Sequence, residues 1–341
     1  MKAAVIVRHG GAECIEVREI DTPAPGPGEV LLAVRAAALN HLDVWVRQGG
    51  RASLPMPWVG GSDAAGVVAA VGHGVTGWKE GDEVVLSGGL DRLDPAPARR
   101  GEHRRITGIV GANRPGTFAQ FAAVPAWTLH RKPAHLDWPG AAALGLDHVT
   151  AWRMLFSRAD LGPGETVLIH GIGGGLALAA LQLAVAGGAR AIVTSSSDEK
   201  LARAAALGAA VGINYKTADV AAGVLAATEG LGADVVCDSV GAATWGINFA
   251  ATRPGGRIVH CGVTTGPDAH VNLRDLYWKQ LTVMGSAMGS QEEFADMLRA
   301  VSAASLSPVL DSTWPLEQAR QAAEHLESGK QFGKIVLTVS E

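Results

Sequence analysis

The 341-residue sequence has few cysteines and no excess of positive charge. Its three cysteines, Cys14, Cys237 and Cys261, are far apart and form no C-x-x-C pair, which argues against a disulfide framework or a cysteine-built zinc site. This usage fits a reducing cytosol, and we predict a cytoplasmic location. The formal net charge of −4 provides no basic field for a nucleic-acid backbone, so no nucleic-acid partner is expected.

The sequence also lacks an apolar run long enough to cross a membrane. The most apolar segment, residues 175–186, is about 12 residues long and includes Gln182, whereas a bilayer needs roughly 20 apolar residues. The apolar start of the chain ends at Arg8, too early for the hydrophobic region of a signal peptide. We therefore expect neither a membrane partner nor export, and interpret residues 175–186 as a buried helix.

Glycine, by contrast, is abundant. The 44 glycines are about 13% of the chain, against an average near 7%, and they follow no Gly-X-Y period. Many tight turns are therefore expected, while the 48% hydrophobic composition is enough for a substantial core.

The first 125 or so residues contain short β-rich runs separated by glycine and proline, a pattern typical of an all-β, barrel-like region. These runs are AAVIV, EVLLAVRAAAL, AAGVVAAVG, DEVVLSG and FAQFAAVP. The loop from Gly88 to Arg114 interrupts them without an apolar period, and we expect it to be exposed.

From about Leu161 short apolar strands alternate with helical stretches, which indicates βαβ units and a doubly wound parallel sheet. The expected strands are TVLIHG, AIVTSS, VGINY, DVVCDSV, RIVHCG and TVMGS. The expected helices between them are LALAALQLAVAGG, DEKLARAAALGA, DVAAGVLAATEG and TWGINFAATRPGG. After residue 291 two amphipathic helices, EEFADMLRAVSA and LEQARQAAEHLES, precede a final strand, GKIVLTV, that is expected to return to the first domain.

A glycine cluster, Gly171, Gly173, Gly174 and Gly175, lies where the strand TVLIH gives way to a helix. Gly171, Gly174 and Ala177 fit the spacing G-x-x-G-x-x-A, whereas G-x-G-x-x-G cannot be placed with three glycines. In this context such a turn binds a dinucleotide pyrophosphate at the helix N-terminus. The alternative is a glycine-rich turn without a ligand.

The next strand ends in Ser195 and Ser196, where an NAD-preferring domain usually has a carboxylate for the ribose 2′-hydroxyl. Hydroxyls with Lys200 a turn into the following helix would accept a 2′-phosphate, which a carboxylate would repel. NADPH is therefore favoured over NADH. Asp198 complicates this prediction, although we expect it to be the N-cap of its helix and to face that helix's own amides.

Together these features form a family pattern. The sequence resembles the medium-chain dehydrogenases and reductases, and within them the zinc-free, zeta-crystallin-like quinone oxidoreductase branch. Its landmarks, in order, are PGPGEVLLAVRAAALNHLDVWVRQG, VGGSDAAGVVAAVG, GDEVV, VTAWRML, HGIGGGLA, INY, GGRIVHCG and QFGKIVL. The resemblance implies an α/β protein with a GroES-like β-barrel catalytic domain at residues 1–135, a Rossmann doubly wound parallel-sheet cofactor domain at 136–290, and a segment at 291–341 that returns to the catalytic domain.

The resemblance also implies that the catalytic zinc of the superfamily is absent. Asn40 stands in place of the first ligand cysteine, Gly61-Ser62-Asp63 replaces Gly-His-Glu, and Leu146 falls at the third ligand. The stretch 88–114, where zinc members hold four cysteines around a structural zinc, contains none, and without that zinc we expect this loop to be mobile. No metal is therefore expected.

Without zinc as a Lewis acid, alcohol oxidation is disfavoured, whereas conjugation in a quinone or enone spreads the charge that arrives with hydride. The resemblance therefore implies NADPH-dependent reduction of quinones or α,β-unsaturated carbonyls in an interdomain cleft, by a homodimer paired through edge strands near VMGSAMG. Three alternatives remain: a reductase of another activated alkene such as an enoyl thioester, a cofactor-binding sensor or structural protein without appreciable turnover, and a metal-dependent alcohol dehydrogenase that uses His41, Asp43, Asp63 or His148 as ligands.

By the same resemblance, four residues are candidates for catalysis. Asn40 would donate a hydrogen bond to the substrate carbonyl and Asp43 would brace the loop, although both are also common turn-formers. Trp45 replaces a family tyrosine and either shapes the substrate pocket or belongs to the core, and it has no acidic hydroxyl to supply a proton. His148 either protonates the enolate or has an ordinary hydrogen-bonding role beside Asp147.

The remaining candidates are assigned to the cofactor. His41 matches a position near the pyrophosphate but is equally consistent with a surface histidine, and Thr150 matches a threonine beside the nicotinamide. Cys261 has no cysteine nearby in the sequence, so a cofactor-wall or core thiol is favoured over a nucleophile. The other positions carried over to the cofactor site are Tyr215, Val240, Gly241, Gly262, Val263 and Lys334.

Overall fold

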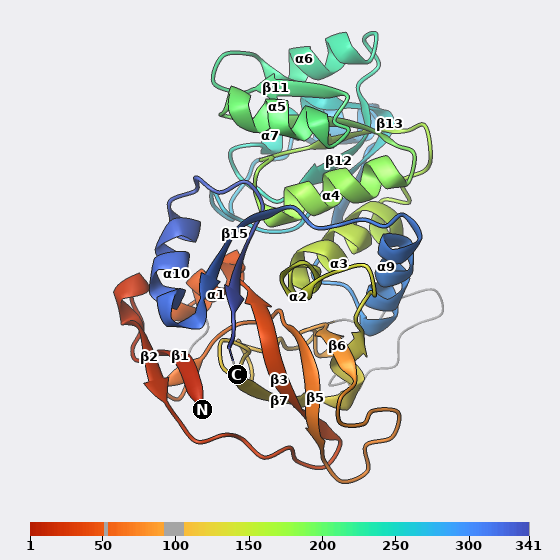
Figure 1. Cartoon of the computed structure of the whole chain (residues 1–341). Coiled ribbons are helices and arrows are strands. Elements are labelled where there is room, and N and C mark those ends of the chain that lie inside the picture. The colour runs from red at the N-terminus through yellow and green to blue at the C-terminus, as the bar shows by residue number, and fades with distance from the viewer. Residues whose placement is uncertain (51–53, 92–105, 341) are drawn as a thin grey trace. The chain divides into compact units, whose positions relative to one another are not determined.

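The computed structural model describes residues 1–50, 54–91 and 106–340. They divide into two compact units: Met1–Val149 with Gly289–Glu341 form unit 1, and Thr150–Met288 form unit 2. Figure 1 shows both units on one ribbon. The division falls after Val149 and not after residue 135, because helix α2 (Trp138–Ala142) packs on the strands of unit 1.

Unit 1 is built on two sheets. The larger has seven strands in the order β15-β16-β3-β5-β6-β8, with β7 paired to β3, and the smaller has the order β2-β1-β4. Their strands are β1 (Lys2–Ile6), β2 (Ile15–Glu19), β3 (Glu29–Ala38), β4 (Trp58–Val59), β5 (Ala65–Val71), β6 (Glu83–Leu86), β7 (Phe121–Pro125), β8 (Leu129–Arg131), β15 (Leu310–Pro315) and β16 (Lys334–Thr338). The five strand runs expected in the first 125 residues are confirmed, whereas the short β2, β4 and β8 were not predicted.

The C-terminal segment completes the larger sheet. β16 pairs antiparallel with β3, with Val336 opposite Ala38 and Thr338 opposite Ala36. Val30, Leu32, Val34, Ile335 and Leu337 are at most 3% exposed and lie in the core of this unit. The helices of unit 1 are α1 (His41–Arg47), α2, α9 (Gln291–Ala303) and α10 (Ala319–Glu327), and α3 (Leu146–Trp152) begins in it.

The loop between Gly88 and Arg114 differs from the expectation where it is described. Gly88, Leu90 and Asp91 on one side and Val110 on the other are buried, whereas Thr107 and Asn113 are exposed, so the described part of this loop is only partly exposed. Residues 92–105, on which the expected mobility of the loop depends, lie outside the described residues.

Unit 2 has one six-stranded sheet in the order β11-β10-β9-β12-β13-β14, and all of its pairings are parallel. The strands are β9 (Thr166–Ile169), β10 (Arg190–Ser195), β11 (Val211–Asn214), β12 (Ala233–Asp238), β13 (Thr252–His260) and β14 (Thr282–Gly285). The connecting helices are α4 (Gly175–Ala186), α5 (Asp198–Ala206), α6 (Val220–Ala227), α7 (Trp245–Ala251) and α8 (Leu273–Trp278). The order reverses between β9 and β12, which is the doubly wound arrangement, and the expected Rossmann fold is confirmed.

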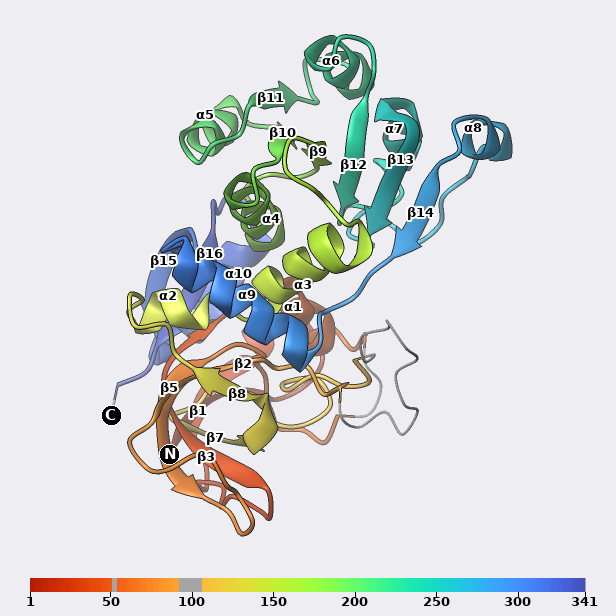
Figure 2. The ribbon, with the colours of Figure 1, turned by 90° about the vertical axis from the view of Figure 1, so that its right-hand side faces the viewer.

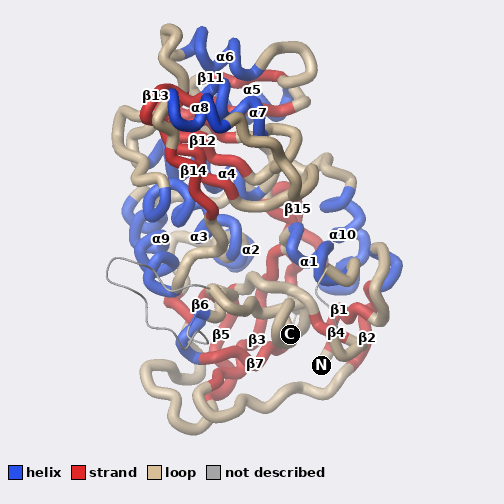
Figure 3. Tube along the Cα trace, turned by 180° about the vertical axis from the view of Figure 1, so that it is seen from behind, coloured by secondary structure: helices blue, strands red, loops and turns tan. Residues whose placement is uncertain are grey.

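The two units differ in secondary-structure content as the sequence indicated. Unit 1 has mostly strands and loops, and unit 2 has alternating strands and helices (Figure 3). Helix α8 was not predicted. It precedes β14, the last strand of its sheet, as Figure 2 shows. Within the described residues no helix is both long and apolar enough to span a bilayer.

Candidate active site and cofactor site

Asn40 lies where β3 ends and α1 begins. It is the N-cap of α1 in extended conformation, and the carboxylate of Asp43, three residues on, accepts the backbone N–H of Asn40 at 2.7 Å. This is the reciprocal contact of a capping box, which fixes the start of a helix. The sequence LNHLD therefore folds into a rigid turn, in which Asp43 holds the backbone of Asn40.

Two chain segments bring polar groups to the side chain of Asn40, and a third contacts one of these groups. Its Nδ2 donates to Asp63 Oδ2 at 2.9 Å, and its Oδ1 accepts from Lys334 Nζ at 2.5 Å. Lys334 Nζ also donates to Asp147 Oδ2 at 2.9 Å and lies 3.4 Å from Asp63 Oδ2. Asn40, Lys334 and Asp63 are 4%, 3% and 0% exposed, so this set, which we call the Lys334 cluster, is a buried part of unit 1.

Asp63 is held from several sides. Its Oδ1 accepts the backbone N–H of Leu146 at 2.7 Å, and its carbonyl oxygen accepts from Thr117 Oγ1 at 2.9 Å. Burial raises the pKa of Asp63, although Lys334 and Asn40 act in the opposite direction. Burial also opposes the charge of Lys334, but Asp147 and Asp63 outweigh it, so the pKa of Lys334 is raised. The two carboxylates therefore favour the charged form of the lysine inside this cluster.

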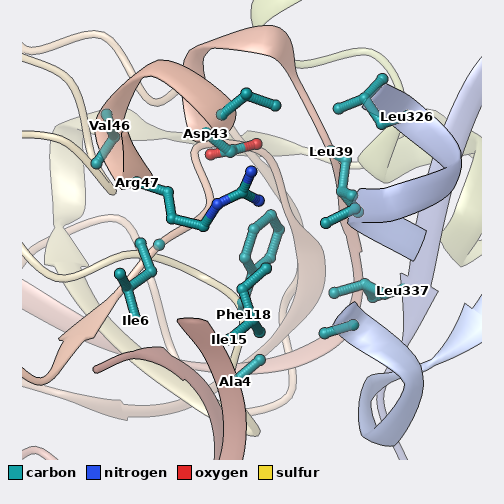
Figure 4. A pocket seen from close by; sticks show the side chains of 14 residues that line it. Ala4, Ile6, Ile15, Leu39, Asp43, Val46, Arg47, Phe118, Leu326 and Leu337 are labelled. Atoms are coloured by element: carbon teal, nitrogen blue, oxygen red, sulfur yellow. The ribbon is translucent and has the colours of Figure 1, made fainter. Parts of the chain in front are cut away.

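Asp43 faces a small cavity within unit 1. The cavity has a volume of about 30 Å³ and is lined chiefly by apolar side chains, and Figure 4 shows the Asp43 carboxylate and the Arg47 guanidinium beside Phe118 and Leu39. This space holds about one water and no quinone. Burial raises the pKa of Asp43 to about 7, with Asp63 adding to the effect. Asp43 therefore supports the backbone of Asn40 and does not face a space that could hold the substrate.

The other catalytic candidates have contrasting environments. Trp45 is 41% exposed, so the alternative that it belongs to the core is wrong. His41 is exposed at the start of α1.

His148 is 4% exposed, and its buried Nδ1 has no hydrogen-bond partner among the described residues. Burial lowers the pKa of His148 to about 4, so its ring is neutral at pH 7 and is poorly suited to donate a proton as an imidazolium.

In unit 2 the glycine cluster forms the turn between β9 and α4. Gly171 and Gly173 have φ of +71° and +123°, a region that favours glycine, and Gly174 is the N-cap of α4. A Cβ at Gly174 would meet nothing within 4 Å, so the backbone is open to an approaching group. The turn thus offers free backbone and the N-terminus of a 12-residue helix, which suits a pyrophosphate.

The end of β10 differs from the expectation. Ser195 is buried at 4% exposure, and its hydroxyl lies 3.4 Å from the carbonyl oxygen of Ile172 in the glycine turn. Ser197, not Asp198, is the N-cap of α5, and the carboxylate of Asp198 accepts from Asn214 Nδ2 at 2.7 Å. The end of the Lys200 side chain lies beside Gly173 of the glycine turn, since a Cβ at Gly173 would lie 2.8 Å from Lys200 Cδ. Ser196 is half-buried.

Buried hydrogen bonds hold the adjacent loops of unit 2. His170, directly before the glycine turn, contacts Thr194 Oγ1 at 3.2 Å and Asn248 Oδ1 at 2.9 Å. Asn248 Nδ2 in turn donates to Asp238 Oδ2 at 2.5 Å, and Asp238 Oδ1 accepts the backbone N–H of Val240 at 2.6 Å. This connection fixes the turn after β9 and the loop after β12 at the carboxyl edge of the sheet, where dinucleotides bind in this fold.

Most of the remaining cofactor candidates follow the strands of unit 2 at this edge of the sheet. Gly241 follows β12, and Cys261, Gly262 and Val263 follow β13. Cys261 is near Cys237, whose pKa is raised by burial and then by Cys261, although no proximity was expected from the sequence. Tyr215 directly follows β11 and is 51% exposed. Thr150 is buried within α3 at the start of unit 2.

Lys334 was expected among the cofactor residues, and in the structure its side chain lies within the Lys334 cluster of unit 1. An ammonium has three N–H donors, and three acceptors from Asn40, Asp147 and Asp63 lie within 3.4 Å of Nζ. The side chain is also buried within unit 1. The assignment of Lys334 to the cofactor therefore stays a prediction, for a side chain whose donors have acceptors within unit 1.

Sequence reasoning did not identify Asp147 as a partner of Lys334, nor His170, Thr194 and Asp238 as supports of the cofactor turn. One signal was available for Asp238, since a carboxylate at the end of an apolar strand requires buried partners. For the other residues the partners are 24 to 187 positions away in the chain, so no local pattern reveals them.

Comparison with known proteins agrees with this architecture. The family description "Alcohol dehydrogenase GroES-like domain" matches residues 26–134, and "Zinc-binding dehydrogenase" matches residues 175–303. A zinc-type alcohol dehydrogenase-like protein of Schizosaccharomyces pombe is 35% identical over 338 residues, which cover 96% of each chain. The chain belongs to the medium-chain dehydrogenase/reductase superfamily.

Other members of the superfamily are similar over nearly the whole chain. The quinone oxidoreductase of Rattus norvegicus is 30% identical and covers 99% of this chain and 97% of its own. The crotonyl-CoA reductase of Streptomyces collinus is 33% identical and covers 94% of this chain and 80% of its own. A solved structure titled NAD-dependent alcohol dehydrogenase superposes with a TM-score of 0.94 at 40% identity, with complete coverage of both chains. The chain is thus an oxidoreductase of this superfamily with a fold that binds a nicotinamide cofactor.

Proposed function

We propose that the chain is a zinc-independent, NADPH-dependent reductase of quinones or α,β-unsaturated carbonyls. The observation that carries this proposal is the Lys334 cluster. At the positions that resemble the catalytic zinc ligands, the chain has an amide at Asn40, a hydroxyl at Ser62 and an apolar side chain at Leu146, and a lysine ammonium lies 2.5 Å from the amide oxygen.

This set of residues does not fit a zinc ion. Zinc in proteins requires thiolate, imidazole or carboxylate ligands, and none of Asn40, Ser62 and Leu146 supplies one. Among the described residues no group of three His, Cys, Asp or Glu side chains is arranged to bind a metal ion. The proposal therefore favours acceptors whose own conjugation stabilises the charge that arrives with hydride.

The residues of unit 2 fit a nicotinamide dinucleotide. The open backbone at Gly174 and the N-terminus of α4 would hold the pyrophosphate, and Lys200 beside Gly173 would meet a 2′-phosphate. Asp198, the nearby carboxylate, is paired with Asn214. When bound, the cofactor supplies a hydride. The task of unit 1 is to orient the acceptor, with Asn40 donating a hydrogen bond to its carbonyl oxygen.

A second candidate is reduction of an enoyl thioester. The similarity to a crotonyl-CoA reductase favours it, because that name describes a conjugated thioester as the acceptor. NADH remains the alternative cofactor, since the solved structure at 40% identity is titled NAD-dependent. A sensor without turnover and a zinc alcohol dehydrogenase are the remaining rivals.

A panel of acceptors tests the proposal. The oxidation of NADPH and of NADH is followed spectrophotometrically with quinones, enones, enoyl thioesters and aldehydes, before and after treatment with a zinc chelator. We expect NADPH to be consumed fastest with quinones or enones, at a rate that the chelator does not change. Loss of turnover on chelation, together with stoichiometric zinc in the untreated protein, would restore the zinc enzyme, and no turnover with any acceptor would favour the sensor.

The proposal includes a homodimer in the cytoplasm. β14 is the outer strand of the sheet in unit 2, and Val283 on it is 40% exposed. Helix α8 before it exposes Leu273, Tyr277 and Trp278 at 69%, 65% and 79%. An apolar edge strand of this kind is a template for pairing with a second chain.

A further inference from the structure

We propose that Asp238 is a positioning residue for the cofactor, which acts on the glycine turn through a buried chain of hydrogen bonds that runs in one direction. This inference rests on the proposed function, since the turn is taken to hold the pyrophosphate of the cofactor. The chain of hydrogen bonds lies wholly within unit 2 and consists, in order, of Asp238, Asn248, His170, Thr194 and the backbone N–H of Gly171.

This chain of hydrogen bonds crosses three neighbouring strands of the sheet. Asp238 is the last residue of β12, His170 directly follows β9, and Thr194 lies in β10. β9 pairs with both β12 and β10. The strand order reverses between β9 and β12, and dinucleotides bind at such a point of reversal. Asp238, Asn248, His170 and Thr194 are at most 2% exposed, so they act on a cofactor through the backbone that they hold.

The direction of the chain begins at the carboxyl group of Asp238. Its Oδ1 accepts the backbone N–H groups of Val240 at 2.6 Å and of Gly241 at 3.3 Å. Its Oδ2 accepts Nδ2 of Asn248 at 2.5 Å and the hydroxyl of Thr244 at 2.8 Å. All of these contacts are with donors, as a carboxylate requires. The amide of Asn248 must therefore point its nitrogen at Asp238 and its oxygen away from it.

The oxygen of Asn248 determines which nitrogen of His170 carries a hydrogen. This oxygen only accepts, and it lies 2.9 Å from Nε2 of His170, so Nε2 must carry the hydrogen. Burial lowers the pKa of His170, although Asp238 and Asn248 act in the opposite direction, so the ring is neutral at pH 7 and Nδ1 is an acceptor. The hydroxyl of Thr194, 3.2 Å from Nδ1, must then donate to it. Its lone pairs are left for the N–H of Gly171, at 3.3 Å.

Gly171 is the residue at which this chain reaches the cofactor turn. Its φ is +71°, and its N–H is held by the hydroxyl of Thr194. The next N–H, of Ile172, donates to the carbonyl oxygen of Thr194 at 2.8 Å. The N–H groups left for a phosphate are those that follow, at the start of α4. A weaker hold on Gly171 should therefore displace the turn and weaken cofactor binding, although no group that touches the cofactor is removed.

The isosteric change Asp238→Asn tests the direction of the chain. The introduced amide keeps its oxygen on the N–H groups of Val240 and Gly241 only by turning its nitrogen toward Asn248. The Asn248 amide should then rotate, and the hydrogen of His170 should move from Nε2 to Nδ1. Nuclear magnetic resonance with histidine-selective nitrogen labelling distinguishes the two tautomers in the protein without cofactor. His170→Gln identifies the signals among those of the 11 histidines.

Cofactor binding gives the functional readout. In Asp238→Asn the hydroxyl of Thr194 loses its acceptor and is shared by two donors, so the hold on Gly171 weakens. NADPH and NADH are titrated by fluorescence, and the dissociation constant of the tighter cofactor should rise about tenfold. Asp234→Asn is the matched control, because this carboxylate lies near the opposite end of β12 and accepts the N–H of Thr166 at 2.7 Å. It should change neither the tautomer nor the dissociation constant.

Two substitutions at Thr194 keep the inference testable if Asp238→Asn does not fold. Thr194→Val retains the shape of the side chain without its hydroxyl, and should raise the dissociation constant of the cofactor about tenfold. Thr194→Ser retains the hydroxyl, and its dissociation constant should stay within about twofold of that of the wild type.

Several outcomes would overturn the inference. They are a wild-type His170 with its hydrogen on Nδ1, an unchanged tautomer in Asp238→Asn, a changed tautomer with unchanged cofactor affinity, and equal affinities in Thr194→Val and Thr194→Ser. A wild type that has the expected tautomer but binds neither NADPH nor NADH would refute the proposed function alone, because the tautomer is read without cofactor.

Discussion

At the scale of single residues, the environment decides what a side chain can do. Asn40 is an ordinary N-cap by sequence, but a carboxylate and an ammonium determine the direction of its amide. His148 has a side chain that titrates near neutrality in water, but burial lowers its pKa to about 4. Asp43 changes in the opposite direction, with its pKa raised to about 7. At these two residues burial moves the pKa away from the value of the free side chain.

Asp43→Asn should change how stability depends on pH. The pKa of Asp43 rises from 3.8 to about 7 on folding, so the protonated carboxyl favours the folded state. Its contribution is present below pH 4 and is lost as the pH rises through 7, by at most about 4 kcal/mol. Melting temperatures at pH 4 to 8 should therefore favour Asp43→Asn increasingly over the wild type as the pH rises. A constant difference across this range would show that the carboxyl is ionised throughout.

At the scale of elements, the turn between β9 and α4 is built for close approach. Gly171 and Gly173 require glycine because of their positive φ, but Gly174 has a φ of −77° and empty space around its missing Cβ. Folding alone therefore does not require glycine at 174. A bound group that touches the backbone would require glycine at 174. Within this one turn, Gly171 and Gly173 are thus needed for the backbone conformation, and Gly174 would be needed for binding.

Gly174→Ala should weaken cofactor binding without reducing stability. A methyl group at this position fits the backbone conformation but occupies the space where a pyrophosphate would lie, so the NADPH dissociation constant should rise at least about tenfold. Fluorescence titration measures the binding, and thermal unfolding measures the stability. Gly246→Ala in α7 is the control, because a Cβ there also meets nothing within 4 Å. Equal NADPH affinities in both variants would contradict a pyrophosphate at the turn.

At the scale of the whole molecule, the two candidate sites lie in different units. Unit 1 carries the Lys334 cluster, with groups from β3, β16 and the start of α3, and unit 2 carries the glycine turn. Unit 2 also exposes apolar side chains on α8 and β14. These two elements lie at the end of its sheet (Figure 2). That exposure is costly in water and is relieved if a second chain covers it.

Val283→Glu should convert a dimer into a monomer. A carboxylate on the edge strand would have to be buried in a paired sheet, and two of them would repel each other. Light scattering after size exclusion should give twice the 35.1 kDa chain mass for the wild type and the single chain mass for the variant. Leu231→Glu, which replaces another exposed apolar residue of unit 2, should leave the mass unchanged. A monomeric wild type would refute the dimer.

Much of the fold was predictable because its patterns are local. The apolar runs of β3, β5, β9 and β12 and the amphipathic helices α9 and α10 follow from periodicity, and the glycine turn follows from its place between strand and helix. The two-residue β4 and the exposed helix α8 carry no such signal. The N-cap of α5 was misplaced by one residue, since Ser197 and Asp198 are both good capping residues and only the backbone geometry distinguishes them.

The sequence by itself determined the superfamily, the two kinds of domain and the replacement of the zinc-ligand residues, because each depends on residue types at short spacings. Only the tertiary structure decided that Lys334 contacts Asn40, that Ser195 is turned inward, and that Asp43 faces a cavity too small for substrate. The physical reason is that hydrogen bonds and desolvation act between groups hundreds of residues apart in the chain, and their effect depends on distances that folding alone establishes.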